Sequence, residues 1–381
     1  MVQPTQAGDP EKFERRAGAL QSRLGSAGAG AAVLAPGPSL YYVSGIWEEP
    51  MERMFVCVVP SDRDPVIVAP SLYDTQLAET TWIEDVRTYD DAEGPRDRLV
   101  AVIDRMNLEG TRVLLDPRMW TAHSHVVRSV LPAVDVGLSD EVIEPLRSVK
   151  DEAEIGAIRR ASAIADDVVR SLRENPESVL NSTECAVARR IERELLDRGG
   201  DSLAFEVVVG SGPNGAKPHH RCGDRSIEPG DPVVLDFGTR VDRYPSDQTR
   251  TMVFGGEPPS EFEAVYRAVR DAQEIAVRAV EPGIEAGEID ERARSLLEER
   301  GYGDEFVHRT GHGVGIEVHE PPSIAGGNDR PLEPGMVISV EPGAYLPGRF
   351  GVRIEDLVLV TETGGERLNE SPRDYRVPAE P

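Results

Sequence analysis

The chain has 381 residues, of which 39% are hydrophobic, and this composition predicts about two folded domains and excludes a disordered or collagen-like chain. The 68 acidic residues outnumber the 42 basic ones, so the formal net charge is −26. A surface this acidic repels phosphate backbones and anionic lipid headgroups, so we expect no nucleic-acid partner and no membrane adsorption.

The first third of the chain has the pattern of an α/β domain. Short Val-rich runs bounded by Pro, Gly or Asp indicate buried strands, and the segments between them have helical periodicity. We expect strands at Ala31–Ala35, Met54–Val59, Pro65–Val68 and Arg112–Leu115, and helices at Glu11–Leu24 and Arg96–Met106. Strands that alternate with helices form an α/β layer. His123 and His125 fall on a further predicted helix, where residues two apart do not share a face, so we expect no metal site there.

A domain boundary is predicted near Pro145–Lys150. Beyond it, apolar residues recur at spacings of three and four from Ile155 to Leu172, which indicates a long amphipathic helix at the start of a second domain. We therefore divide the chain into an N-terminal domain of residues 1–147 and a C-terminal domain of residues 148–381.

Two more helices are predicted in the second domain. Ser260 and Glu263 have the spacing of a capping box ahead of a helix over Val265–Val280. The other helix covers Ile289–Arg300 and ends at Gly301, a residue type that is common at helix C-termini. The segments around these helices are Gly- and Pro-bounded strands, and they carry most of the unusual polar residues.

Two segments of the second domain repeat one pattern. Each contains a Glu-Pro-Gly turn and an apolar strand followed by an acid, which is Asp236 in the first copy and Glu341 in the second. A further strand in each copy carries another acid, Asp247 or Glu355. One such acid alone is a common turn cap, but two duplicated units that face each other would bring four carboxylates to one point. Four converging carboxylates raise one another's pKa, so the pattern predicts a pair of divalent cations that neutralise them.

Histidines gather in the same domain. Five of the seven lie after residue 200, namely His219, His220, His308, His312 and His319. Glycines at positions 311, 313 and 315 disfavour a helix around His312 and allow the backbone to approach a centre closely. Because 312 and 319 differ by an odd number, a turn between them is needed for both side chains to serve one site.

The C-terminal domain resembles the pita-bread metallopeptidases, the family of methionine aminopeptidase, aminopeptidase P and prolidase, over residues 150–363. Five segments match that family's motifs in order, and they are Asp236-Phe-Gly, Asp247-Gln-Thr-Arg-Thr251, Gly311-His312-Gly-Val-Gly, Val340-Glu341-Pro-Gly and Val352-Arg-Ile-Glu355-Asp. The N-terminal domain resembles the smaller domain of aminopeptidase P, prolidase and creatinase. The resemblance implies an α/β (α+β) fold in which a creatinase/prolidase-like domain precedes a pita-bread domain with a pseudo-twofold duplicated β-sheet core.

The resemblance also implies roles for individual residues. A dinuclear metal site would be held by Asp236, Asp247, His312, Glu341 and Glu355. His219 matches the substrate-side histidine, and His308 and His319 match the pair that steadies the tetrahedral intermediate. Arg353 matches an arginine next to the ligands, and Thr249 matches a hydroxyl near the metals.

The implied activity is hydrolysis of the Xaa-Pro bond, by a prolidase or an aminopeptidase P. Two divalent ions about 3.5–4 Å apart can hold a bridging hydroxide and polarise the scissile carbonyl. Glu341 is our candidate for passing the hydroxide's proton to the leaving amine. Four carboxylates and one imidazole favour Mn²⁺ or Co²⁺, with Zn²⁺ and Fe²⁺ as the other candidates. The expected partners are a proline-containing di- or oligopeptide and, by family analogy, a second copy of the chain in a homodimer.

Two other functions stay open: a metal-free amidinohydrolase resembling creatinase, and a non-catalytic binding module on the same fold. The complete ligand set argues against both, because clustered carboxylates without cations repel one another. A dinucleotide site at Gly210–Gly215, which matches GxGxxG, is disfavoured because Pro213 and Pro218 interrupt the helix that such a site requires. Arg243 departs from the family, which usually has glycine before the following tyrosine, so we expect a different local loop there.

The cysteines and the acid excess suggest an environment. Cys57, Cys185 and Cys222 are far apart and form no paired framework, so we expect reduced thiols and a cytoplasmic protein, with Cys222 as a small apolar filler. Residues 1–10 lack the features of a signal peptide, and no uninterrupted apolar stretch reaches about 18 residues. Acid excess with only three lysines is the usual composition of proteins in molar salt, so we expect a halophilic protein.

Overall fold

The computed structural model describes residues 10–108, 110–131 and 135–378. Residues 1–9, which make up most of the segment that lacks signal-peptide features, lie outside the described residues. The chain divides into two compact units, Met1–Arg147 and Ser148–Pro381. No helix among the described residues is both long and apolar enough to span a membrane.

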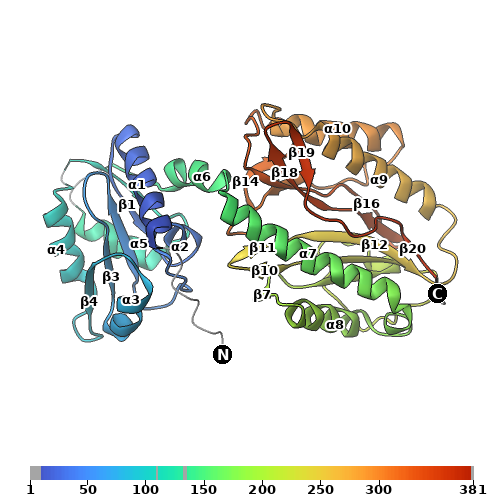
Figure 1. Ribbon diagram of the computed structural model, residues 1–381, viewed down its shortest axis with the longest axis horizontal. Coiled ribbons are helices and arrows are strands. Elements are labelled where there is room, and N and C mark those ends of the chain that lie inside the picture. The colour runs from blue at the N-terminus through green and yellow to red at the C-terminus, as the bar shows by residue number, and fades with distance from the viewer. Residues whose placement is uncertain (1–9, 109, 132–134, 379–381) are drawn as a thin grey trace. The chain divides into compact units, whose positions relative to one another are not determined.

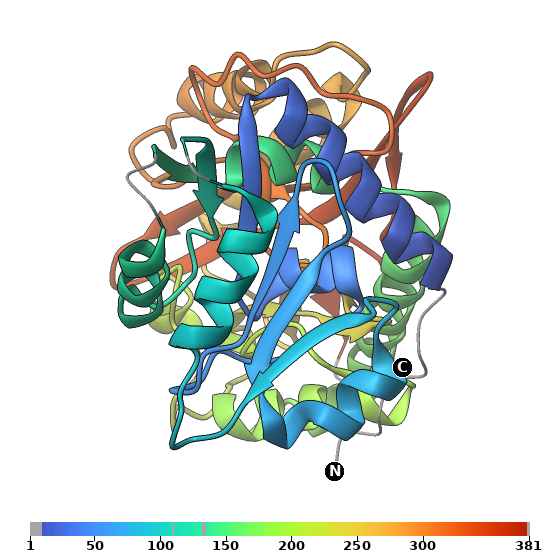
Figure 2. The same cartoon turned by 90° about the vertical axis from the view of Figure 1, so that its left-hand side faces the viewer.

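The first unit is built on a six-stranded mixed sheet in the order β4-β3-β2-β1-β5-β6. Its strands are β1 Ala29–Leu34, β2 Val56–Pro60, β3 Val66–Pro70, β4 Asp85–Tyr89, β5 Arg112–Leu115 and β6 Val136–Leu138. Its helices are α1 Pro10–Ser26, α2 Pro38–Ser44, α3 Asp74–Thr80, α4 Arg96–Met106, α5 Thr121–Val130 and α6 Asp140–Ser148, with a 3₁₀ turn at Ser71–Tyr73. The predicted strands and helices of this region are all present, which confirms the α/β layer. Figure 2 shows the strands side by side, with α1 next to β1.

Alternation of side chains along these strands lets the sheet bury both of its faces. One face packs against α4 and α5, in a cluster that includes Val33, Val58, Val68 and Ile103. Residues between these in sequence, such as Ala32, point the other way and are equally buried. A sheet that is buried on both faces needs near-continuous apolar strands, which is why the Val-rich runs were readable from the sequence.

The second unit contains two successive copies of one arrangement, a helix pair followed by strands. The first copy consists of α7 Glu152–Glu174, α8 Glu184–Asp197, β7 Ser202–Leu203, β8 Val208–Ser211, β9 Pro232–Phe237, β10 Thr239–Val241, β11 Tyr244–Pro245 and β12 Gln248–Phe254. The second consists of α9 Phe262–Ala279, α10 Ala286–Glu299, β13 Gly311–Gly313, β14 Glu320–Ile324, β15 Val337–Val340, β16 Gly343–Leu346, β17 Phe350–Arg353 and β18 Asp356–Thr361. Strands β19 Gly364–Arg367 and β20 Arg376–Val377 and 3₁₀ turns at Pro176–Ser178 and Gly212–Asn214 complete the unit.

The duplicated acid-bearing segments form matching strand pairs. In the first copy β9 and β12 are antiparallel and are joined through the hairpin β10–β11. In the second copy β15 and β18 are antiparallel and are joined through the hairpin β16–β17. The predicted strand-loop-strand repeat is therefore confirmed. Gly230 and Gly335, the turn glycines before β9 and β15, have φ values of 91° and 90°, a backbone conformation that favours glycine.

Two helix pairs cover the strands of this unit. Helices α7 and α8 pack with β8, β9 and β12 in one apolar cluster. Helices α9 and α10 pack with β15, β16, β17 and β18 in another. In Figure 1, α8 lies below these strands and α9 and α10 lie above them. The acid-bearing strand ends thus lie between two helix-covered cores.

The predicted capping box at Ser260 is wrong. Helix α9 begins at Phe262 with Glu261 at the N-cap, and no side chain caps it. The turn before it is closed instead by the Phe262 amide, which donates to the carbonyl of Pro259 at 2.9 Å. A capping box is present at the start of α7, where the amide of Glu154 donates to the Asp151 carboxylate at 2.9 Å and the amide of Asp151 donates to the Glu154 carboxylate at 2.8 Å.

The expectation that the cysteines form no pair is also wrong. Cys185 and Cys222 form a disulfide between Cα atoms 5.0 Å apart, so Cys222 is not a simple apolar filler. Cys185 lies in the first turn of α8 and Cys222 in the loop before β9, and an antiparallel bridge between Thr183 and Ser226 brings these segments together. A sequence separation of 37 gave no hint of this pairing. The cysteines therefore no longer argue for a reducing compartment.

Candidate active site

The five predicted ligands lie at equivalent places in the duplicated strands. Asp236 is near the end of β9 and Glu341 follows the end of β15. Asp247 and Glu355 immediately precede β12 and β18, the partner strands. His312 comes from β13, which pairs with β15. Each copy therefore contributes two acids, and the second copy adds an imidazole.

The structure brings these side chains into one cluster, in which Asp247, His312 and Glu355 are buried and the other two are partly buried. Nε2 of His312 lies 3.1 Å from Oε1 of Glu341 and 3.7 Å from Oδ2 of Asp247. Potential ligand atoms of Asp247, His312 and Glu355 all lie within 4.8 Å of one another. Asp236 acts electrostatically on Asp247 and Glu355, which places it beside the same group.

The acids of the cluster differ in their ionisation. Burial raises the pKa of Asp236, and it raises the pKa of Asp247 and Glu355 well above the ordinary values, with repulsion from the neighbouring acids adding to the effect. Burial also opposes ionisation of Glu341, but the hydrogen bond and charge of His312 prevail and lower the pKa of Glu341 to about 2. The cluster cannot hold four carboxylates in the ionised form without added positive charge.

The donor atoms fit divalent cations. Oδ1 of Asp236 and Oε1 of Glu355 are buried and have no hydrogen-bond partner among the described residues. A buried carboxylate oxygen without a partner is costly, and coordination to a cation would remove that cost. Four carboxylates with one imidazole form an oxygen-rich set that suits a hard or borderline ion. These residues therefore fit the two ions that the sequence predicts.

A hydrogen-bonded chain connects the cluster with His308. Arg353 donates to Oδ2 of Asp236 at 2.5 Å and to the hydroxyl of Tyr345 at 2.9 Å. The Tyr345 hydroxyl in turn lies 2.9 Å from Nε2 of His308, whose Nδ1 lies 2.7 Å from the Arg309 carbonyl. Burial lowers the pKa of His308, which keeps its imidazole neutral at pH 7. Both ring nitrogens of His308 are therefore engaged.

Thr249 joins Arg353 to a different acid. Its hydroxyl donates to Oε2 of Glu355 at 2.7 Å and accepts from Nε of Arg353 at 3.0 Å. Arg353 thus contacts Asp236 directly and reaches Glu355 through one hydroxyl. Arg353 and Thr249 therefore lie beside the predicted ligands.

His319 lies at the edge of the cluster. Its ring packs against that of His312 with centroids 4.1 Å apart and an interplanar angle of 78°. The antiparallel pair β13–β14 supplies the turn that the odd spacing of these two histidines requires. Burial lowers the pKa of His319 to about 4, and the neighbouring His312 acts in the same direction although His319 keeps part of its surface in solvent.

His219 lies on an exposed loop and not in the buried cluster. The carbonyl of the preceding Pro218 accepts a hydrogen bond from Arg353 at 3.5 Å, which ties this loop to the cluster. The charge of His219 also acts on His319. The structure therefore places His219 close to the site but in solvent, where an incoming molecule can reach it.

The glycines of the His312 segment allow close backbone packing, as predicted. A Cβ on Gly311 would lie 2.0 Å from the carbonyl oxygen of Ser339, and one on Gly313 would lie 2.3 Å from that of Pro321. A Cβ on Gly315 would lie 2.2 Å from Oε2 of Glu320. At Gly311 and Gly313 the obstacle is backbone, so no side chain fits there without a shift of β13 from its neighbours, whereas at Gly315 the Glu320 side chain would have to move.

Sequence reasoning missed Ser339 and Tyr345. The Ser339 hydroxyl accepts from the amide of His312 at 3.0 Å and donates to Oε1 of Glu341 at 3.3 Å, so it orients both ligands. A lone hydroxyl in the apolar strand Val337–Val340 was an available signal. Tyr345 gave none, because its position depends on the fold of the hairpin β16–β17.

Two segments that the sequence analysis set aside have the following structure. Gly210–Gly215 contains the 3₁₀ turn Gly212–Asn214, and turns and bends follow it over residues 215–219 in place of the helix of a dinucleotide site. His123 stacks on Trp120 and lies near the Glu52 carbonyl. Among the described residues, one group of side chains could hold a metal, and it is the cluster around His312.

The departure at Arg243 has a clear structural consequence. Asp242 and Arg243 form the tight turn between β10 and β11, with φ values of 50° and 75°. A left-handed backbone costs a residue with a Cβ roughly 1–2 kcal/mol. Glycine would avoid that cost, so the arginine strains a turn whose shape the hairpin fixes.

Comparison with known proteins adds to this picture. Residues 156–362 match the model of metallopeptidase family M24, and residues 16–149 match the creatinase/prolidase N-terminal domain. The chain is 38% identical to a probable dipeptidase PepE of Mycobacterium tuberculosis over 374 residues, or 97% of each chain. It is 34% identical to an Xaa-Pro dipeptidase of Lactobacillus delbrueckii subsp. lactis, over 94% of this chain and 97% of that one.

Solved structures are similar over nearly the whole chain. A prolidase from Thermococcus sibiricus, 38% identical, superposes with a TM-score of 0.91 and covers 96% of this chain and 98% of its own. The dipeptidase PepE from Mycobacterium ulcerans is 37% identical with a TM-score of 0.91, over 97% and 99%. An X-Pro aminopeptidase from Thermotoga maritima is 30% identical with a TM-score of 0.83, over 95% and 99%. The predicted fold class, a creatinase-like domain followed by a pita-bread domain, is confirmed.

Proposed function

Because the chain belongs to metallopeptidase family M24, we propose that it hydrolyses the peptide bond between an N-terminal residue and proline. The observation that carries this proposal is the cluster of four acids and His312, in which two buried carboxylate oxygens have no hydrogen-bond partner among the described residues. The preference for proline rests on the similarity to an Xaa-Pro dipeptidase and to prolidases. Both alternatives, the amidinohydrolase and the binding module, leave these oxygens unexplained.

Asp236, Asp247, His312, Glu341 and Glu355 would hold two divalent ions. When bound, such ions supply a Lewis acid for the scissile carbonyl and a hydroxide nucleophile at neutral pH. The oxygen-rich ligand set favours Mn²⁺ or Co²⁺. Arg353 keeps Asp236 in place, and Thr249 does the same for Glu355.

Glu341 is the proposed proton carrier of the reaction. As a carboxylate beside the proposed ions, it can accept a proton from the nucleophile and deliver it to the proline nitrogen as that bond breaks. Ser339 orients the same carboxylate through its hydroxyl. Glu341 therefore serves as a ligand and as a base.

The histidines would act on the substrate. His319 is neutral at pH 7 and lies at the solvent edge, so its ring N–H can donate to the oxyanion of the tetrahedral intermediate. His308 is placed differently: its Nδ1 faces a carbonyl and so carries the N–H of the neutral ring, which leaves Nε2 as an acceptor, and His308 could donate to the oxyanion only after Nε2 gains a proton. His219, on the exposed loop, would contact the substrate before the bond is cleaved.

Hydrolysis assays on Mn²⁺-loaded protein test the proposal. We expect release of proline from Ala-Pro, little or no cleavage of Ala-Ala, and no urea from creatine. A longer Ala-Pro-Xaa peptide separates a dipeptidase from an aminopeptidase. Cleavage of creatine alone would favour the amidinohydrolase, and binding of peptides without cleavage would favour the binding module.

We further propose that the chain forms a homodimer, by analogy with its family. Light scattering in high salt would give twice the chain mass of 41.6 kDa. A mass equal to one chain would contradict the dimer and leave the proposed activity unaffected.

A further inference from the structure

The Cys185–Cys222 disulfide lies next to the loop that carries His219. Cys185 is in the first turn of α8, and Cys222 is three residues after His219. Both cysteines are partly exposed, so a small reductant can reach them. Cys57, by contrast, is buried in β2, and burial raises the pKa of its thiol to about 12. The disulfide is therefore the accessible redox group among the described residues.

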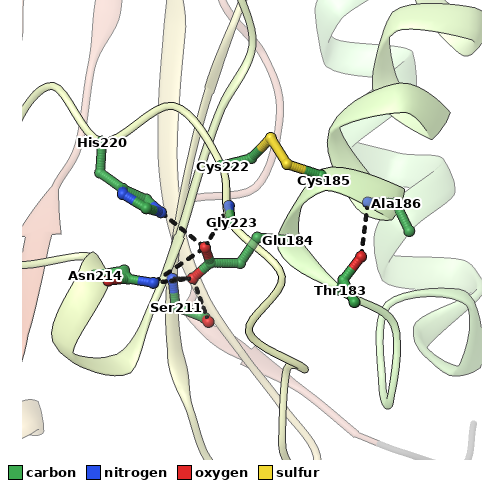
Figure 3. The surroundings of a disulfide bond; sticks show 9 residues. All are labelled: Thr183, Glu184, Cys185, Ala186, Ser211, Asn214, His220, Cys222 and Gly223. Atoms are coloured by element: carbon green, nitrogen blue, oxygen red, sulfur yellow. Dashed lines mark hydrogen bonds and ion pairs between the residues drawn. A yellow bond between two sulfur atoms is a disulfide. The ribbon is translucent and has the colours of Figure 1, made fainter.

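A buried carboxylate holds the same loop from within (Figure 3). Glu184 is fully buried and accepts from the amide and hydroxyl of Ser211 at 2.7 and 2.6 Å, from Asn214 at 3.1 Å and from the amide of Gly223 at 2.9 Å. It also lies 2.7 Å from Nε2 of His220. Burial opposes its ionisation, but the hydrogen bonds from Ser211 and His220 prevail and lower the pKa of Glu184.

The disulfide and the carboxylate join the same two segments. Glu184 and Cys185 are adjacent on α8, and their partners Gly223 and Cys222 are adjacent on the loop (Figure 3). The amide of Cys185 also donates to the carbonyl of Gly223 at 3.1 Å. The loop that carries His219 reaches the site at Pro218, whose carbonyl accepts a hydrogen bond from Arg353.

The second copy of the duplicated fold has a carboxylate in the equivalent place. Asp290 of α10 accepts from the amide and hydroxyl of Thr310 at 2.9 and 2.8 Å and from the amide of Gly326 at 3.1 Å. These contacts match those of Glu184 with Ser211 and Gly223. No disulfide accompanies them among the described residues. The Cys185–Cys222 bond is therefore a second anchor, which the first copy has beside its carboxylate.

We propose that the Cys185–Cys222 disulfide is a reversible latch on the His219 loop, and that its reduction weakens substrate binding without altering the metal ligands. This inference rests on the proposed function, since it assigns His219 to the substrate side. In the step, a dithiol supplies two electrons and two protons. The S–S bond breaks, each cysteine becomes a thiol, and the dithiol becomes a disulfide. A small-molecule disulfide reverses the reaction.

Steady-state kinetics on Ala-Pro with the metal-loaded holoenzyme tests the latch. We expect dithiothreitol to raise KM about fivefold or more, a typical size for coupling between two sites, while kcat changes little. The double variant C185S/C222S should show the raised KM with and without reductant, which also controls for removal of metal by the thiol. The variant C57S should respond as the wild type does. If dithiothreitol also raised the KM of the double variant fivefold, the effect would not come from the disulfide, and the proposal would be overturned.

The variant Glu184→Gln tests whether the disulfide and the Glu184 carboxylate hold the same loop. The amide keeps the shape but loses the charge that strengthens the hydrogen bonds. If disulfide and carboxylate hold one loop, reduction should raise KM by a larger factor in Glu184→Gln than in the wild type. Equal factors in the two proteins would show that the anchors are independent and would contradict the latch.

Hydrogen exchange provides a readout that does not depend on activity. The amides of Ser211 and Gly223 should exchange faster after reduction, and those in β9 should not change. If the oxidised holoenzyme cleaves no Xaa-Pro peptide, the proposed function fails, and exchange still decides on the latch. Unchanged exchange at Gly223 after confirmed reduction would overturn the latch. Free thiols at Cys185 and Cys222 in the native protein before reduction would also overturn it.

Discussion

Glu341 differs in its electrostatics from the other acids of the cluster. Nε2 of His312 lies 3.1 Å from its carboxylate and lowers its pKa to about 2, whereas the pKa values of Asp247 and Glu355 are raised. Among the four acids Glu341 is thus the one in close contact with the imidazole of His312, and it is the proton carrier that we propose.

We expect Glu341→Gln to lower kcat by about 10²–10⁴-fold, the usual contribution of a positioned acid–base group. The fold should stay intact, because the amide has nearly the same volume and Ser339 can still hydrogen bond to it. Kinetics, bound metal and thermal unfolding would be measured together. Glu333→Gln, at an exposed position in the turn before β15, is the matched control. Near-normal turnover in Glu341→Gln would refute the assignment.

Ionisation of Glu274 on α9 makes the free energy of unfolding depend on pH in the acid range. Burial opposes its ionisation, but hydrogen bonds from Arg373 and Arg367, at 2.9 and 2.7 Å, prevail and lower its pKa to about 2. A lowered folded-state pKa stabilises the fold above the unfolded value of 4.5, and this contribution is lost as pH falls through about 2.

The free energy of unfolding of the wild type should therefore exceed that of Glu274→Gln at pH 6, and the difference should shrink as pH falls from 4.5 toward 2. Denaturant titrations at several pH values measure it. Glu263→Gln, on the same helix and paired with Arg267, controls for the loss of one negative charge. A difference that grows on acidification would contradict the sign.

At the scale of elements, the position of β13 depends on a glycine. A Cβ on Gly311 would clash with the carbonyl oxygen of Ser339 on β15, so β13 would have to move and carry His312 with it. We expect Gly311→Ala to destabilise the fold by about 1–3 kcal/mol, as overpacking does, and to weaken metal binding.

Gly18→Ala is the matched control for that change. Gly18 is exposed in α1, and a Cβ there meets no atom within 4 Å. Alanine in a helix interior should stabilise by about 0.5–1 kcal/mol. Chemical denaturation and metal titration of both variants would be compared. Normal metal affinity in Gly311→Ala would show that β13 does not need the close contact.

Elements buried on both faces can be predicted from the sequence more readily than polar or exposed ones. Buried strands such as β2 and β3 were predicted because burial on both faces requires continuous apolar runs. Strand β4 was missed because Asp85–Tyr89 is mostly polar and only its last residue is fully buried. The capping box was placed at Ser260 although Asp151 and Glu154 have an equally good spacing, since spacing alone does not show where a helix begins.

The site was also only partly predictable. The duplicated acids identified the strand ends that converge, because the repeat is written in the sequence. The hydrogen-bonded chain from Arg353 through Tyr345 to His308 was not predictable, since it joins residues that only the folded hairpin β16–β17 brings together. The disulfide was not predictable for the same reason, because a contact between residues of two separate segments produces no periodic pattern in the sequence.

At the scale of the whole molecule, the net charge of −26 now has two parts. Four acids belong to the proposed metal site, and most of the rest can be at the surface. Exposed pairs such as Arg349–Glu261 and Arg159–Glu366 contribute only about 0–1 kcal/mol each, so they do not offset the repulsion of such an excess.

Salt should therefore stabilise the protein. Raising KCl from about 0.1 M to about 1 M shortens the Debye length from about 10 Å to about 3 Å, which screens the repulsion between surface carboxylates. We expect Tm to rise over this range, and scanning calorimetry measures it. An unchanged or falling Tm would contradict the halophilic part of the account.

The central claim is that the two duplicated halves jointly hold two divalent ions for peptide hydrolysis. Titration of metal-free protein with Mn²⁺, with bound metal and Ala-Pro hydrolysis followed in the same samples, tests it most directly. The account predicts two ions per chain and activity that rises with their binding. Full activity in chelator-treated protein, or no bound Mn²⁺ at saturation, would contradict it.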